Sequence, residues 1–593
     1  MSVSKLSSTI TGLYSGQRKL SDEKYTYRYL QTAMRTLDEA VGYSARGGRK
    51  ENVFPSDWPD KSVRLNDYKR MEKVRKNPDY GTKTAKLSVK VRDENGDPLI
   101  AEIRLYPNDK ASRDGVTSGY TNDYKIKHIE EIAEEIYGAP YDVDPTSDYV
   151  WYDYFRRTTA ENGEFSEELP VGRYRLVCDK GSEFEVVETA VNVPGTTEVT
   201  LRRLVDMGKD SWYVGDLHHH SVFSSPLYPP QGTDYVYDTP EMIQNSMRAK
   251  GLTFGALSDH HNVLNHRTWE KLVTPDFLPI LSKEISTSNG HVLQLNTDPD
   301  VIYHIPEEKD RTPEIMRAEY RRITDEIKGF GGHPQINHPR DMQKAISFPP
   351  EFTDMIDIFK TIEIWNGSHP LAEGCTNGNA MQLWLDCLEK GTFLGATTGS
   401  DTHEITCEFW FDSLAYVFGL YTAVKAALDN TLEAKNEKGV ILEGENLELA
   451  HYFVDLLTEE LPILKHWGEV NLSSGCVRTY VHAEGERTPE NLLKNLEQGH
   501  SFLTNGPIIE AKLQDDGTAE LKIVSNRPLS RLLVYSNGQS IEEFDLADPA
   551  DLNGGFDYSC TVNLNTEGKK WFIFRLLGED VVTEAITNPV FVK

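Results

Sequence analysis

The stretch WYVGDLHHH, residues 212–220, decides the fold of the central part of this chain. Its apolar residues run into His218 and His220, a pattern typical of a strand that ends in polar side chains. Because side chains alternate along a strand, both imidazoles share one face, about 6–7 Å apart at Cα. That spacing suits one metal ion, although an isolated pair of this kind is also common among ordinary surface and core histidines. The carboxyl end of a strand is where α/β folds build their sites.

The segments that follow repeat a strand and then a helix. PEMIQNSMRAKG starts with Pro240, a residue favoured at the first helical position, and ends at Gly251. LTFGALSDHHN, residues 252–262, has the pattern of another strand. Repeated units of this kind indicate an α/β domain with a parallel sheet, either open or barrel-like.

The flanking regions have different patterns. From Ala85 apolar and polar residues alternate around a turn at 94–97, which predicts a small β-sandwich, and β-runs return from Val477 onward. Residues 1–80 hold 16 Lys and Arg against 10 Asp and Glu, so we expect a basic N-terminal extension. Helical periodicity is found at 25–41 and 411–470. We therefore predict an extension at 1–83, a β-sandwich at 84–206, an α/β domain at 207–474 and a C-terminal β-sandwich at 475–593.

Composition excludes several classes of protein. The 593 residues include 63 Lys and Arg against 93 Asp and Glu, a net charge of −30, which argues against binding to nucleic acid or anionic lipid. No apolar run approaches the length of a transmembrane helix, and the N-terminus does not have the pattern of a signal peptide. The six cysteines form no CxxC pair, which argues against a disulfide scaffold or a thiolate zinc site. We expect a cytoplasmic protein.

Further polar side chains follow strand-like runs in the same central region. Twelve of the 17 histidines lie between His218 and His403. Asn289-Gly290 predicts a hairpin that brings Glu284 and His291 together. The other strand ends and turns supply Asp259 with His260, His338 with His333 as its competitor, Glu363, and Asp401 with His403. Imidazole and carboxylate ligands without thiolate suit Zn, Mn or Fe in a hydrolytic site.

The series DLHHHS, SDHHN, KEISTSNGH, NHP, EIWNG and GSDTH, between residues 216 and 403, resembles the polymerase-and-histidinol-phosphatase (PHP) metallohydrolase superfamily. It is most similar to the carbaryl-hydrolase-like (CehA/McbA) branch, as is the tail RTYVHAEGERTPENLLKNLEQGHSFLTNGP at 478–507. Residues 84–206 resemble a carboxypeptidase regulatory-like β-sandwich. The resemblance implies a distorted (β/α)7 barrel with two or three divalent ions at the carboxyl ends of its strands.

The resemblance also implies roles for individual residues. The first metal would be held by His218, His220, Glu284 and Asp401, and the second by Glu284, His291 and His338. A third would use His260 and His403 with a ligand at a position that is Pro226 here, so these two histidines could instead hold substrate or protonate the leaving group. Asp401 could accept a proton from water. The expected substrate contacts are Glu363, Asn366 and Asn505, although Glu363 and the turn around Asn505 could equally be structural.

These features predict a hydrolase in which metal-activated hydroxide cleaves a small-molecule ester. A phosphoester ranks slightly ahead of a carboxyl or carbamate ester. The alternatives are a non-catalytic protein that binds glycans or partners and, disfavoured by the net charge, a nuclease. The sequence leaves the natural substrate, the metal and the oligomeric state open.

Overall fold

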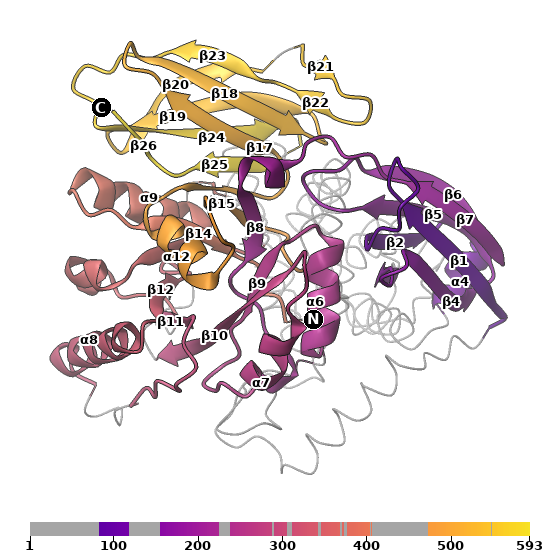
Figure 1. Ribbon diagram of the computed structural model, residues 1–593, viewed down its shortest axis with the longest axis horizontal. Coiled ribbons are helices and arrows are strands. Elements are labelled where there is room, and N and C mark those ends of the chain that lie inside the picture. The colour runs from indigo at the N-terminus through magenta and orange to yellow at the C-terminus, as the bar shows by residue number, and fades with distance from the viewer. Residues whose placement is uncertain are drawn as a thin grey trace, which may run out of the picture.

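The protein is described from a computed structural model (Figure 1). The structure describes residues 82–117, 155–224, 236, 238–287, 290–304, 311–341, 346–367, 371–372, 376–403, 405, 473–546, 548–580 and 582–592. The helices expected at 25–41 and 411–470, and Pro226, lie outside these ranges. None of the helices within them is long and apolar enough to cross a membrane.

Two sheets form the N-terminal region. One has the order β4(Glu164–Pro170), β1(Thr84–Arg92), β7(Gly195–Thr200), and the other has the order β3(Phe155–Thr158), β2(Glu102–Pro107), β5(Gly172–Asp179), β6(Val187–Val193). Alternate side chains of β1, Leu87, Val89 and Val91, pack with Ile103 and Leu176 of the second sheet in one buried core. This arrangement is β-sandwich-like, as the alternating pattern predicts. A short helix, α4(Lys110–Thr117), packs against it.

The central region follows a single sheet path. In chain order its strands are β8(Trp212–Asp216), β9(Phe254–Leu257), β10(Leu278–Thr287), β11(Gly290–Leu295), β12(His333–Asn337), β13(Thr361–Asn366) and β14(Gly395–Gly399). Pairing is parallel from β8 to β10 and from β12 to β14. Only β11 among these strands runs antiparallel to its neighbours. The reason is that the short link from β10 permits a hairpin, whereas a parallel crossover needs about a dozen residues.

Helices and short 3₁₀ turns lie between most of these strands along the chain. They are α6(Pro240–Ala249), α7(His266–Trp269), α8(Pro313–Gly329) and α9(Thr376–Glu389), with 3₁₀ turns η1(Met207–Asp210), η2(Val222–Ser224), η3(Glu270–Leu272) and η5(Pro350–Ile358). The helix expected from Pro240 forms, and the Thr239 side chain caps it by accepting a hydrogen bond from the Met242 amide. The cap satisfies a backbone donor that a helix N-terminus otherwise leaves unpaired.

The chain beyond β14 lies beside the chain beyond β8. His219 and Thr402 form an isolated parallel bridge, the His220 amide donates to the Thr402 carbonyl at 3.0 Å, and the Asp401 amide donates to the His218 carbonyl at 2.8 Å. The pairing of the named strands nevertheless runs from β14 to β8 and on into β15, so the sheet order does not establish a closed barrel. The bridge brings the first and last ligand-bearing segments into contact.

The C-terminal strands continue the same sheet. β15(Arg478–His482) pairs antiparallel with β8, and β16(Ser501–Thr504), β25(Glu584–Thr587), β24(Trp571–Gly578), β19(Leu529–Ser536) and β20(Gln539–Asp545) extend it, with β26(Val590–Phe591) on β24. A second sheet holds β17(Ile508–Leu513), β18(Thr518–Ser525), β22(Phe556–Asp557) and β21(Ala550–Asp551), with β23(Cys560–Asn563) on β18. In Figure 1 the strands from β17 to β26 are stacked above the central region, whereas β15 lies next to β8 and α12(Pro489–Glu497) lies beside β14.

A buried salt-bridge cluster joins the N-terminal sheets to the central region. Lys250, which follows α6, donates to Asp179 at 2.9 Å and lies 3.4 Å from Glu102. Arg104 donates to Asp179 at 2.8 Å, and Arg156 donates to Glu102 at 2.9 Å. All five side chains are buried. Each carboxylate therefore meets cations from its own sheet and from the neighbouring region.

Candidate metal centre

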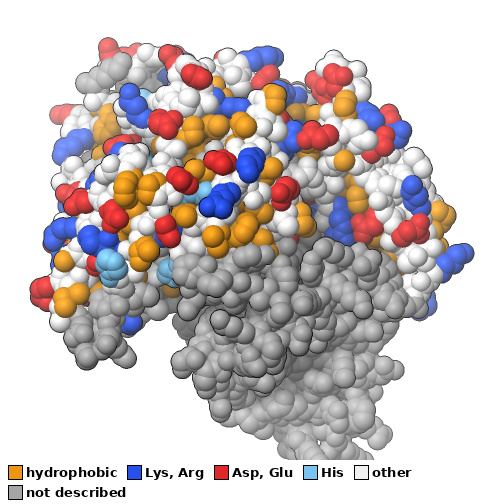
Figure 2. All heavy atoms as spheres, turned by 60° about the horizontal axis from the view of Figure 1, so that its bottom comes forward, with side chains coloured by type: hydrophobic (Ala, Val, Ile, Leu, Met, Phe, Trp, Pro, Cys, Tyr) orange, Lys and Arg blue, Asp and Glu red, His pale blue; other side chains and the backbone are white. Residues whose placement is uncertain are grey.

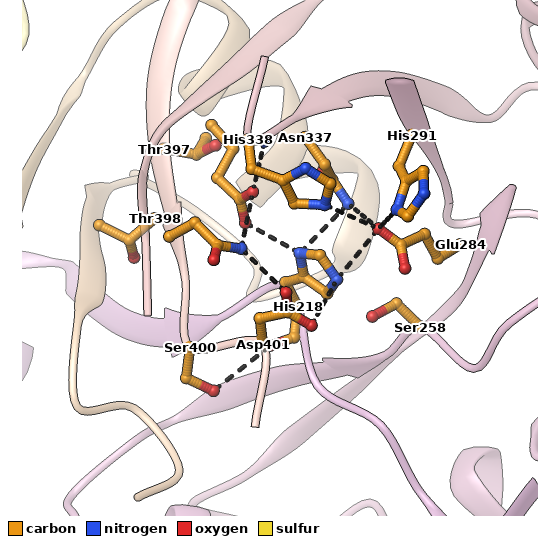
Figure 3. Close-up of polar contacts among 12 residues, drawn as sticks. His218, Ser258, Glu284, His291, Asn337, His338, Thr397, Thr398, Ser400 and Asp401 are labelled. Carbon is orange, nitrogen blue, oxygen red and sulfur yellow. Dashed lines mark hydrogen bonds and ion pairs between the residues drawn. The ribbon is translucent and has the colours of Figure 1, made fainter. Parts of the chain in front are cut away.

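Eight histidine and carboxylate side chains converge where the central strands end. His218 and His220 follow β8, His260 follows β9, Glu284 lies on β10, His291 on β11, His338 follows β12, and Asp401 and His403 follow β14. Seven of them form three groups whose ligand atoms lie within 4.8 Å of one another: His218, Glu284 and His338; His218, His220 and Asp401; His220, His260 and His403. The eighth, His291, contacts Glu284. Figure 3 shows five of the eight, His218, Glu284, His291, His338 and Asp401, facing one another.

The Glu284 carboxylate lies at the centre of the cluster. Its Oε1 is 3.2 Å from Nε2 of His218, 3.1 Å from Nδ1 of His291 and 3.3 Å from Nε2 of His338. Its Oε2 is 3.1 Å from Nδ1 of His260. Burial raises the pKa of Glu284, but His218 and His291 outweigh burial and hold the pKa well below its ordinary value. Both oxygens are therefore anionic acceptors, one toward each side of the cluster.

His218 presents one ring nitrogen to the cluster and the other to Glu363. Its Nδ1 lies 3.0 Å from Oε1 of Glu363 and 3.1 Å from Nδ2 of Asn337; because an ionised carboxylate only accepts, we assign the proton of the neutral ring to Nδ1. Its Nε2 then faces Glu284 and, at 3.2 Å, Oδ1 of Asp401. Burial lowers the pKa of His218, but Asp401 and Glu284 outweigh it and hold the pKa well above its ordinary value. The surroundings of Nε2 therefore favour a positive charge, carried by either a proton or a metal.

Asp401 closes the opposite side of the cluster. Its Oδ1 lies 3.0 Å from Nε2 of His220, and its Oδ2 accepts a hydrogen bond from Asn366 at 3.3 Å. Burial raises the pKa of Asp401, but His218 and His220 keep the pKa well below its ordinary value. Its φ of +52° aims the side chain back into the cluster. The Asp401 side chain is 27% exposed, whereas that of Glu284 is 1% exposed, so Asp401 lies on the solvent side.

The third group stacks around His220. The His220 ring lies 4.3 Å from that of His260 and 4.1 Å from that of His403, between centroids. Burial, with His403 and His260 nearby, holds the pKa of His220 well below its ordinary value. His260 is buried, but the His403 side chain is 33% exposed. His403 and Asp401 therefore form the accessible edge of the centre.

Close approach of the backbone allows this packing. A Cβ on Gly399 would lie 2.1 Å from Oε1 of Glu363 and 2.3 Å from Cβ of His218. Any larger residue would separate these two side chains. Gly399 belongs to the GSDTH motif, and its lack of a side chain explains why a glycine ends β14.

Both oxygens of Glu363 and the side-chain nitrogen of Asn366 already have partners in the site. Glu363 is fully buried and accepts from His218, from the His338 amide at 2.8 Å and from Asn366 at 3.2 Å. Asn366 divides its amide between Glu363 and Asp401. In the structure both support ligand side chains, while substrate contact by either stays a prediction.

Asn505 serves a turn. Its amide donates to the Val582 carbonyl, and its side-chain oxygen accepts from the Glu584 amide at 2.8 Å. Of the two histidines that compete in GGHPQINHP, His338 reaches Glu284, while His333 begins β12 at its other end and contacts Thr361. The structure thus separates the two on geometric grounds.

Two residues in the site were not anticipated. Asn337 donates to Oε1 of Glu284 at 2.9 Å from the last position of β12. Asp216 accepts from the amides of His218, Ser400 and Gly475, and so ties together three segments around the centre. The available signal was a polar residue at the end of a strand, one position before His338 for Asn337 and two positions before His218 for Asp216. That signal resembles Asp259 before His260.

The donor set fits a divalent cation. Around Nε2 of His218 lie Nε2 of His220 at 3.3 Å and the carboxylate oxygens of Glu284 and Asp401. In the neutral rings with the proton on Nδ1, both Nε2 atoms turn lone pairs toward the carboxylate oxygens. A buried cluster of facing acceptors is costly unless a cation lies between them. Imidazole and carboxylate without thiolate suit Zn, Mn or Fe.

Comparison with known proteins adds two distant structural similarities. No family model and no curated protein matches the chain. A "putative metal-dependent phosphoesterase" from Bifidobacterium adolescentis has 17% identity, covering 32% of this chain and 87% of that chain, with a TM-score of 0.23. An amidohydrolase from Chromobacterium violaceum has 19% identity, the same two coverages and a TM-score of 0.21. At these scores neither similarity carries an argument, and the reasoning below rests on the centre itself.

Proposed function

We propose that this protein is a metal-dependent hydrolase of the PHP type that cleaves a small-molecule ester, with a phosphoester ahead of a carboxyl or carbamate ester. We place it in the carbaryl-hydrolase-like branch, with the central strands as a distorted seven-stranded barrel. One observation carries the proposal: Nε2 of His218 and Nε2 of His220 each lie 3.0–3.6 Å from carboxylate oxygens of both Glu284 and Asp401.

The sharing of ligands supports two metals. One nitrogen of His218 is committed to Glu363, so the ring can serve one metal even though it belongs to two of the three groups. If His218 joins His220 and Asp401 at the first metal, the second is left with Glu284, His291 and His338. A carboxylate, unlike an imidazole, has two oxygens and can bridge both positions, as the central place of Glu284 allows.

A third metal has weaker support. His220 is shared between the first group and the third, and its use at the first metal leaves His260 and His403 as the third pair among the described residues. We therefore assign His403, and behind it His260, to substrate binding or to protonation of the leaving group. The exposure of His403 favours it as the residue that meets substrate.

The residues divide the chemistry between them. Divalent metals, when bound, lower the pKa of water and stabilise negative charge on an ester oxygen. Oδ1 of Asp401 faces His220, and Oδ2 accepts a hydrogen bond from Asn366. These two contacts hold the carboxylate in a single orientation at the solvent edge. We assign Asp401 to accept the proton released from water. The buried histidines keep bulk water from the opposite side of the centre.

The partner we propose is a small molecule. Lys and Arg side chains intermix with Asp and Glu on the described face seen in Figure 2, with no basic stripe for a nucleic acid. Together with the net charge of −30, this favours a small substrate that binds at the metals over a polyanion that binds along the protein surface.

The test compares substrates that share one leaving group. Protein loaded with manganese or zinc is given p-nitrophenyl phosphate, its diester and p-nitrophenyl acetate, so the ratio of rates reports the electrophile. We expect metal-dependent turnover of the phosphates. Turnover of the acetate alone would move the assignment to carboxyl or carbamate esters. Full activity in metal-free protein would overturn the proposal.

A further inference from the structure

A buried serine connects the central histidines to a carboxylate that is not a ligand. Ser224 ends the short η2 turn and is fully buried. Its Oγ lies 3.0 Å from Nδ1 of His220 and donates to Oδ1 of Asp259 at 2.7 Å. The same oxygen accepts from the His260 amide at 3.2 Å. One hydroxyl therefore contacts two cluster residues and a buried anion.

The number of hydrogen bonds that the Ser224 hydroxyl can donate and accept determines the tautomer of His220. A serine hydroxyl has one hydrogen to donate and two lone pairs to accept with. The hydrogen goes to Asp259, and one lone pair is taken by the His260 amide. Nδ1 of His220 can then bond to Ser224 only as a donor, so the ring proton must lie on Nδ1. Nε2, which is 3.0 Å from Oδ1 of Asp401, is left with its lone pair.

Asp259 is held in the accepting state required for this arrangement. Its Oδ1 accepts from the Ser221 amide at 2.7 Å in addition to Ser224, and its Oδ2 accepts from the Ser221 hydroxyl at 2.7 Å and from Asn265 at 2.6 Å. Four donors match the acceptor capacity of an ionised carboxylate. The Ser224 hydrogen therefore has a fixed direction, away from His220.

We propose that Asp259 and Ser224 are positioning residues that lock His220 in the Nδ1–H tautomer, so that its Nε2 is presented to the first metal. The proposal rests on the proposed function in that it assumes a metal at His218, His220 and Asp401. Glu363 does for His218 directly what Asp259 does for His220 through a hydroxyl. Residues behind a histidine ligand typically change metal affinity about 10–100-fold when removed.

The chain offers a matched control. Ser221 is equally buried and donates to the same carboxylate at the same distance, but no contact recorded for the described residues joins its hydroxyl to a cluster side chain. Metal-free Ser224→Ala and Ser221→Ala proteins are titrated with zinc and with cobalt(II) against a chromophoric chelator. We expect Ser224→Ala to bind about 10–100-fold more weakly than wild type and to show an altered cobalt absorption spectrum. Ser221→Ala should remain within about threefold of wild type, because it removes one of the four bonds to Asp259 but no contact to His220.

Equal affinities in the two variants, or equal losses, would overturn the proposal, because equal losses would report only packing of the turn. If the alanine variant fails to fold, Ser224→Thr and Ser224→Val provide a second comparison, because the Thr and Val side chains have nearly the same volume and differ in the hydroxyl. Thr retains the hydroxyl and should bind metal more tightly than Val, and equal binding by the two would also overturn the proposal. If wild-type protein bound neither metal, the proposed function would fail instead, so the two failures are distinguishable.

Discussion

Two buried polar clusters lie in this molecule, and they differ in how their charges are completed. In the salt-bridge cluster at the N-terminal sheets, Arg104, Arg156 and Lys250 supply N–H donors to the oxygens of Glu102 and Asp179. In the candidate metal centre, ring nitrogens and carboxylate oxygens face one another. In the first cluster the chain itself supplies cations to the carboxylates, whereas the second is a group of side chains that could hold a metal ion.

The comparison teaches that burial of charge alone does not mark a site. Both clusters are buried, and both lower the pKa of their carboxylates, because cationic neighbours outweigh burial for Asp179 as histidines do for Glu284. The distinguishing feature is the balance of donors and acceptors. A buried ion pair with its partners present has a structural role, whereas an excess of acceptors indicates a missing positive charge.

The largest effect that would test the comparison is expected at Asp401. Asp401→Ala removes a ligand oxygen and the acceptor that faces both histidines, so we expect turnover to fall about a thousandfold or more, or about 4 kcal/mol in the barrier. Metal content per chain should fall as well. Lys250→Met is the control, because it lies in the other cluster. A variant that keeps both metal and rate would contradict the assignment of Asp401.

The next effect is on stability and should come from the other cluster. Lys250→Met leaves Asp179 and Glu102 with fewer cations in a buried place, and we expect the free energy of unfolding in urea to fall by about 3 kcal/mol. Lys522, which pairs with Glu510 at the surface, is the matched control, and Lys522→Met should cost less than about 1 kcal/mol. Equal losses would show that Lys250 is not part of a buried network.

Acid should weaken the salt-bridge cluster. Burial raises the pKa values of Asp179 and Glu102, but the cations outweigh burial and hold both pKa values below their ordinary range. The stabilisation is therefore present above the unfolded pKa of about 4 and is lost as pH falls below it. Urea unfolding of wild type and Lys250→Met between pH 6 and pH 3 should show the difference between the two shrinking with acid. A constant difference would contradict the pairing.

The smallest effect is expected at Asn366. Asn366→Ala removes one hydrogen bond to Asp401 and one to Glu363 but no ligand, so we expect kcat to fall about threefold to tenfold with metal content unchanged. A change confined to KM would instead support the substrate contact predicted from the sequence. Steady-state kinetics with the best p-nitrophenyl ester separates the two.

The parts of the site that were predictable from sequence follow local geometry. Histidines two apart after an apolar strand, and a hairpin at Asn289-Gly290, place His218 with His220 and Glu284 with His291 through short-range rules. The β10–β11 pairing sets Ser286 opposite His291 and Thr287 opposite Gly290, so Glu284 lies two positions from the partner of His291, on the same face of the sheet. These rules need no knowledge of distant segments.

The rest depends on contacts between distant segments. The roles of Asn337, Asp216 and Gly399 come from strands that meet only after the chain has crossed over repeatedly, and no spacing along the sequence encodes those distances. Glu363 and Asn505 show the same limitation of sequence patterns. Each is a polar residue in a motif, but the pattern does not reveal that its side chain already bonds to other parts of the chain. Which atoms already bond to each side chain decides whether it is free to bind a ligand.

The pairing of β8 with β15 limits where recombination can divide this chain without exposing a strand edge. His218 and His220, the first two residues of the candidate metal centre, follow β8, and one edge of β8 is covered by a strand that begins at Arg478. A gene fragment ending near residue 474 would leave that edge open to pairing with other chains. Recombination that exchanges the C-terminal module must therefore supply a replacement strand of the same register. The unit that evolution can move intact is the ligand-bearing region together with its C-terminal neighbour.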